Sequence, residues 1–170
     1  NYIACPIISH INRYLCSVKL VSMFKKIIAA LTLFAAFSVQ SQVVINEIDA
    51  DTPSTDVKEF IELKSATPFM ALDGYVLVFF NASSSGTTNL SYLAIDLDGL
   101  VTDGNGIILL GNPLVVPAAS YTIPAGSIQN GPDGVAIYLG NATDFPTNTP
   151  GTNVNLVDAL VYSNSATTSA

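Results

Sequence analysis

Carboxylates are the side chains of this chain whose spacing is best suited to chemistry. Four of them fall within eleven residues, with Glu47 just before them: Asp49, Asp51, Asp56 and Glu59. Ca²⁺ takes six to eight oxygen ligands and tolerates irregular geometry, so a loop of this kind can hold it. The spacing differs from that of an EF-hand loop, and acidic loops on net-negative proteins are commonly solvated without a metal. The four carboxylates are therefore candidate calcium ligands, with a plain solvated loop as the alternative.

A second acidic group is a weaker candidate for the same ion. It consists of Asp96, Asp98 and Asp103 with Asn105. Two of its members precede glycine in turn-like sequences, where aspartate is favoured for ordinary backbone reasons.

Glu59 raises a separate question, because strand alternation places it on the same face as Ile61 and Leu63. The favoured interpretation puts its carboxylate at the end of a sheet, in water. The alternative is a buried carboxylate that needs hydrogen-bond donors, for example backbone N–H groups of a neighbouring loop.

The residue types that other kinds of catalytic site require are missing from most of the chain. From Gln42 to the end the chain has no Cys, His, Arg or Trp, which removes zinc sites and histidine- or cysteine-based triads. A Ser–Lys pair would depend on Lys58 or Lys64 alone. Pairs of carboxylates suited to glycoside hydrolysis arise by chance in any acidic chain. We therefore expect no catalytic or cofactor-binding residues, and no enzyme activity from this chain itself.

Charge divides the chain into two unlike parts. All 13 acidic residues lie from Glu47 onward, where only two lysines oppose them, so this part has a formal net charge of −11. Such a surface repels phosphate backbones, and we expect no direct binding of nucleic acid. A divalent cation or a basic partner suits it better.

The first 41 residues resemble a targeting segment rather than part of a fold. Residues 23–41 have the order of a helical signal peptide: a start-like Met, two lysines, an apolar core over 27–37 and a small-residue end. The apolar core is shorter than the roughly 20 residues of a membrane span. We predict cleavage before Gln42, interpret residues 1–22 as a non-native upstream extension, and keep one uncleaved membrane anchor over 1–41 as the alternative.

The remaining part consists of short apolar runs separated by Gly, Pro, Asn, Asp and Ser, which is typical of an antiparallel all-β domain. The expected strands cover about 43–48, 58–65, 75–81, 90–97, 107–110, 135–139 and 155–162, with an edge strand near 121–123. The run over 75–81 is apolar almost throughout, which predicts a central strand covered on both faces. The predicted fold is an immunoglobulin-like antiparallel β-sandwich.

Several segments, in this order, resemble a known family: INEI, a polar loop, EFIEL, LDGYVLVFFN, NGPDGVAIYLG and LVDALVYSN. This order resembles the lamin-tail domain found in secreted bacterial proteins, over about residues 43–162. Such domains are immunoglobulin-like sandwiches without enzymatic activity of their own. They often lie beside nucleases, phosphatases or other hydrolases in exported proteins, frequently in the Bacteroidetes.

The resemblance implies a function for residues 42–163, with 164–170 as a linker or a truncated end. We expect a noncatalytic interaction or positioning module of a larger bacterial protein, secreted or on the cell surface, with no membrane span after signal cleavage. Its partner would be a protein, a cell-surface component or a covalently attached catalytic domain. The alternatives are an accessory fragment of a secreted nuclease- or phosphatase-type hydrolase, and a polymer-binding module.

Overall fold

A computed structural model describes residues 42–52, 55–82 and 89–163 of this chain. All of them belong to one unit, Ser41–Ala170. The predicted upstream extension, the signal peptide and residues 164–170 lie outside the described residues.

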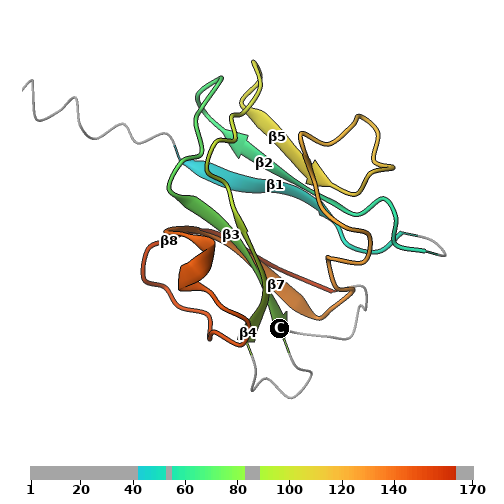
Figure 1. Cartoon of the computed structure of the whole chain (residues 1–170), viewed down its shortest axis with the longest axis vertical. Helices are drawn as coiled ribbons and strands as arrows, with labels where there is room; N and C mark the ends of the chain where they lie inside the picture. Colours follow the sequence, from blue (N-terminus) through green and yellow to red (C-terminus); the bar gives the residue numbers. More distant parts are fainter. Residues whose placement is uncertain (1–41, 53–54, 83–88, 164–170) are drawn as a thin grey trace, which may run out of the picture. The chain divides into compact units, whose positions relative to one another are not determined.

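Eight strands and one short 3-10 helix make up the described chain (Figure 1). Their bounds are β1 Val43–Asp49, β2 Phe60–Ser65, β3 Tyr75–Ala82, β4 Asn89–Asp96, β5 Ile107–Gly111, β6 Tyr121–Thr122, β7 Asp133–Leu139, η2 Ala142–Asp144 and β8 Leu156–Tyr162. The strands form two four-stranded sheets, in the orders β1-β2-β5-β6 and β4-β3-β7-β8. The predicted all-β, two-sheet sandwich is confirmed.

Alternation of apolar and polar residues decides which face of each strand is buried. Ile61 and Leu63 of β2 are fully buried, whereas Phe60, Glu62 and Lys64 between them are half-exposed. In β3 all six residues from Tyr75 to Phe80 are buried, because this strand is central and covered on both faces. Both patterns were predicted from the sequence.

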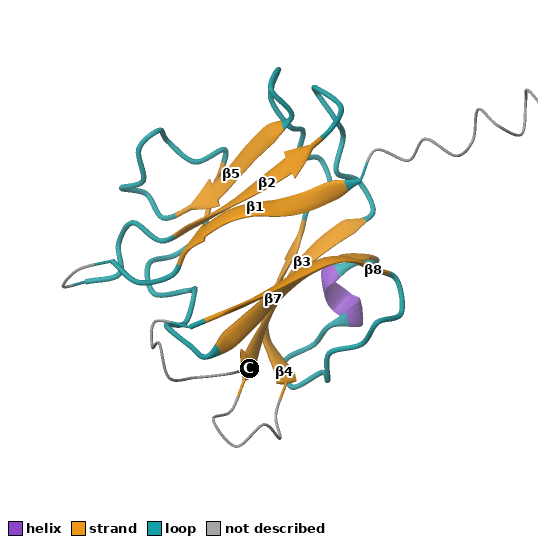
Figure 2. Cartoon of the chain, turned by 180° about the vertical axis from the view of Figure 1, so that it is seen from behind, coloured by secondary structure: helices purple, strands orange, loops and turns teal. Residues whose placement is uncertain are grey.

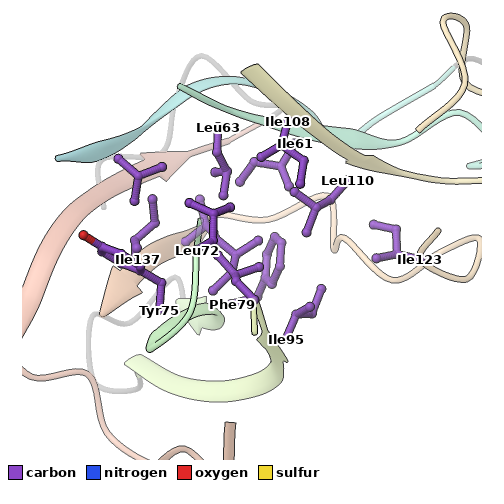
Figure 3. Packing of buried hydrophobic residues seen from close by; sticks show 14 of the residues in the cluster. Ile61, Leu63, Leu72, Tyr75, Phe79, Ile95, Ile108, Leu110, Ile123 and Ile137 are labelled. Atoms are coloured by element: carbon purple, nitrogen blue, oxygen red, sulfur yellow. The ribbon is translucent and has the colours of Figure 1, made fainter. Parts of the chain in front are cut away.

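The main core lies between the two sheets (Figure 3). Side chains of β2 and β5 meet those of β3 and β7 there, among them Ile61, Leu110, Phe79 and Ile137. Burial of this apolar surface is the principal force holding one sheet against the other.

A second apolar cluster covers the opposite face of the β3–β7 pair. Val76, Val78, Phe80, Ala136 and Tyr138 are its buried members. This cluster is covered by the same chain, because η2 lies on this side of the sheet (Figure 2) and Ala142 and Phe145 pack against the cluster. The rings of Tyr138 and Phe145 have their centroids 4.6 Å apart.

Three details differ from the expected strands. The pairing of β5 with β6 is parallel rather than antiparallel, because a proline-rich connection carries the chain back before β6. The connection between β7 and β8, where no element was expected, contains the η2 turn, in which Asp144 Oδ2 accepts the Asn141 N–H at 2.8 Å. Strand β8, expected over 155–162 as one of the short apolar strands, has most of its residues exposed because it is the last strand of its sheet.

The edge strands of the two sheets are bridged by side chains. Asp158 of β8 accepts the main-chain N–H of Ile45 in β1 at 2.8 Å, and Gln42 donates to the Val157 carbonyl at 2.9 Å. These bonds occupy backbone groups that an exposed edge would offer to another chain. Among the described residues, no helix has the length and hydrophobicity of a membrane span.

Candidate functional site

The acidic segment and the 126–133 segment meet at one end of the sandwich. The side-chain amide of Asn130 donates to Asp56 Oδ2 at 3.2 Å and to Asp51 Oδ1 at 3.4 Å. The Asp56 carbonyl accepts the Gly126 N–H at 3.1 Å, and its Oδ1 accepts the Thr52 N–H at 3.1 Å. Asn130 therefore joins two of the four predicted carboxylates, although it lies more than 70 residues away in sequence.

A small open pocket of about 180 Å³ lies beside this junction. Its polar lining comes from the end of β1, from Asn130 and from the end of β8: Asp49, Asp51, Asn130, Tyr162 and Ser163. The lining offers carboxylate, amide and hydroxyl groups, which suit a small polar or cationic ligand.

Glu59 does not belong to this lining. Its side chain is fully buried, so the interpretation that placed its carboxylate in water is wrong. Glu59 is buried because it directly precedes Phe60, the first residue of β2, and because the chain near Ile128 covers this end of the core. Burial raises the pKa of Glu59 above its ordinary value of 4.5, while the Ile128 N–H and the Asn112 amide act to lower it. Neither carboxyl oxygen reaches full hydrogen-bond geometry with a described group.

Three further polar groups lie near Glu59 and influence one another's ionisation. Burial raises the pKa of Tyr92 and of Tyr162, and the charges of Asp133 and Glu59 raise both further. Burial also raises the pKa of Asp133, whose Oδ1 accepts the Ala82 N–H at 3.1 Å. The Tyr92 hydroxyl accepts the Gln129 N–H at 3.1 Å. Burial therefore disfavours the charged form of each of these groups.

Of the four candidate calcium ligands, the structure brings Asp51 and Asp56 together through Asn130, with Asp49 beside them in the pocket lining. Glu59 is separated from them by its burial. Within residues 42–52, 55–82 and 89–163, no three acidic, His or Cys side chains are grouped as metal ligands are. The calcium site stays a prediction, with Asp49, Asp51 and Asp56 as its accessible members.

The second acidic group is engaged with the backbone instead. Asp98 Oδ1 accepts the Gly74 N–H at 2.6 Å, and Asp96 Oδ2 accepts the Ala142 N–H at 3.2 Å. Asp103 Oδ1 accepts the N–H groups of Ile107 and Asn105, which lower the pKa of this carboxyl. The Asp103 contacts are those of a turn-forming aspartate, whereas Asp96 and Asp98 bond to segments that are distant in sequence.

Asn112 is a residue that the sequence did not single out. It is almost fully buried, and its side-chain amide donates to the carbonyls of Ile123 and Pro124 at 3.3 and 2.9 Å. It lies in a proline-rich segment, where an asparagine ordinarily indicates an exposed turn. Only the pairing of β2 with β5 places it beside Glu59.

Comparison of the chain with family models, with curated proteins and with solved structures finds no match in any of the three.

Proposed function

We propose that this chain is a noncatalytic, exported lamin-tail-like domain of the immunoglobulin-like type. It acts as an interaction or positioning module of a larger secreted or cell-surface bacterial protein. Catalysis, where the parent protein has any, belongs to another domain.

The observation that carries this proposal is the place of the family-like segments in the sandwich. INEI and EFIEL form the neighbouring strands β1 and β2, and YVLVFFN forms the central strand β3. The last two segments pair with each other as β7 and β8. Segments that resemble a family in order thus supply neighbouring strands in each of the two sheets.

The two buried acids do not line the open pocket, which agrees with a role other than catalysis. Glu59 and Asp133 both have a raised pKa, and both lie in the interior rather than in an open cleft. The two described lysines are the only basic side chains from Gln42 onward, so a positively charged group to stabilise a phosphoryl transition state is scarce.

The experiment expresses the full chain in a bacterial host with its own leader and purifies the exported product. We expect no turnover of DNA, RNA or phosphate mono- and diesters above the buffer rate, and an N-terminus at Gln42 by mass spectrometry. A charged residue placed in the leader, Leu31→Arg, is expected to abolish export. Turnover that Asp133→Asn or Glu59→Gln removes while the fold is retained would overturn the proposal.

A further inference from the structure

The outer face of the first sheet combines apolar side chains with an opposed pair of carboxylates. We define the β1–β2–β5 outer face by Val44, Glu47, Phe60, Glu62, Lys64, Ile107 and Leu109. These residues share one side of the sheet because the register pairs them across strands. Their neighbours Ile61, Leu63, Ile108 and Leu110 point to the core.

Glu47 and Glu62 lie directly opposite each other on this face. Like charges in directly opposed positions of an antiparallel pair are destabilising. Asn46 donates its side-chain amide to Glu62 Oε1 at 2.6 Å, which leaves both charges in place. The one cation of this face, Lys64, donates instead to the Asn105 carbonyl at 3.1 Å. Among the described residues, neither glutamate makes an ion pair.

The outer face of the second sheet is covered by another segment of the same chain. There η2 and Phe145 pack on Tyr138 and its neighbours, and the apolar residues are buried. On the β1–β2–β5 outer face, by contrast, Phe60, Ile107 and Leu109 are half-exposed, and Val44 is 37% exposed.

We infer that the β1–β2–β5 outer face docks a protein segment in which lysine or arginine side chains stand beside aliphatic ones. The cations would neutralise the Glu47–Glu62 pair, while the aliphatic groups cover Phe60 and Leu109. Charge complementarity selects this partner, because the chain from Gln42 onward has 13 acidic residues and two lysines. The inference rests on the proposed function and names the surface and the chemistry of the partner.

The test uses the exported chain, labelled with ¹⁵N, and a 12-residue peptide in which lysine alternates with valine. We expect amide shift changes on β1, β2 and β5, and weaker binding as salt rises. The double variant Glu47→Gln, Glu62→Gln is expected to weaken binding about fivefold, the loss of two exposed ion pairs. The matched control is Asp73→Asn, Asp98→Asn, which removes the same charge elsewhere and keeps acceptors for the N–H groups of Gly99 and Gly74.

Three results with peptides would overturn the inference: equal weakening in both double variants, shift changes centred on other strands, or equal binding of the same peptide with glutamate in place of lysine. Equal shifts caused by dextran would instead assign the face to an uncharged polymer, and would overturn it too. Failure here is distinct from failure of the proposed function. Turnover of a substrate would contradict the proposed function. Peptide binding through another surface would contradict only the inference about the β1–β2–β5 outer face.

Discussion

Asn112 bonds to both backbone polar groups of Glu59. Its main-chain N–H donates to the Glu59 carbonyl at 2.9 Å, and its side-chain Oδ1 accepts the Glu59 N–H at 2.8 Å. Its amide nitrogen donates to the Ile123 and Pro124 carbonyls. One buried side chain thus joins the start of β2, the end of β5 and the segment after β6, in a region where backbone groups would otherwise lack partners.

Replacement of Asn112 by alanine should therefore be costly. Asn112→Ala leaves the Glu59 N–H and the carbonyls of Ile123 and Pro124 without these partners, and we expect a loss of about 3 kcal/mol in the free energy of unfolding. Urea denaturation followed by circular dichroism measures it. The control is Asn153→Ala, at an exposed position, with an expected change within about 0.5 kcal/mol. Equal effects of the two substitutions would contradict this role.

Burial of Glu59 predicts a pH dependence of stability. Because its folded pKa is raised above the unfolded value, the folded state holds the proton more tightly. The contribution of this group is fully present below about pH 4.5 and is lost as pH rises through the folded pKa. Asp56, Asp133, Tyr92 and Tyr162 are the titratable groups that act on it or respond to it.

Glu59→Gln isolates this contribution. The variant is expected to gain stability over the native chain as pH rises from 4.5 to 8, because the amide stays neutral in the core. Unfolding midpoints of both proteins across that range measure the difference, and Asp73→Asn, at an exposed position where the amide keeps an acceptor for the Gly99 N–H, is the control. A stability difference that stays constant with pH would show that the Glu59 carboxyl keeps an ordinary pKa.

The sequence predicted the sheet framework well because alternation depends on local pattern. The inward direction of Ile61 and Leu63, and the double cover of the strand that begins at Tyr75, follow from side-chain period alone. The direction of Glu59 followed too, but its burial did not. That depends on where residues near Ile128 lie, which a pattern of apolar residues does not contain.

The acidic site was predicted only in part for a similar reason. Asp51 and Asp56 were singled out from their closeness in sequence, whereas their shared partner Asn130 lies on a distant segment. The exposure of β8 was missed because an edge strand and a central strand can have the same composition. Long-range pairing decides each of these points.

Gly106 is required by the close approach of another strand. Its φ is +76°, and an added Cβ would meet the carbonyl oxygen of Ser65, the residue whose N–H donates to the Gly106 carbonyl at 2.7 Å. Gly106→Ala should cost at least about 3 kcal/mol, from backbone strain and the displacement of β2. Gly99 has φ +77° with open space around it, so Gly99→Ala should cost about 1–2 kcal/mol, the strain alone. Thermal and urea unfolding of the pair measure the difference, and equal losses would show that Ser65 can move aside.

The opposed pair Glu47 and Glu62 predicts a substitution that stabilises the fold and weakens its binding. Glu47→Lys turns a like-charge pair into an opposite-charge pair, which should add about 0.5–1 kcal/mol to the free energy of unfolding. Glu47→Gln removes the repulsion alone and should give a smaller gain. Both gains should shrink in 1 M salt, where exposed charges are screened within about 3 Å.

The same variant tests why the two glutamates face each other. If the pair serves to receive a cationic partner, Glu47→Lys should bind the lysine–valine peptide more weakly than Glu47→Gln does, in the reverse order of their stabilities. Urea midpoints and peptide titrations on the same three proteins measure both orders. Matching orders of stability and affinity would mean that the carboxylates are ordinary surface charges. Opposite orders would mean that this face carries a cost in stability that binding offsets.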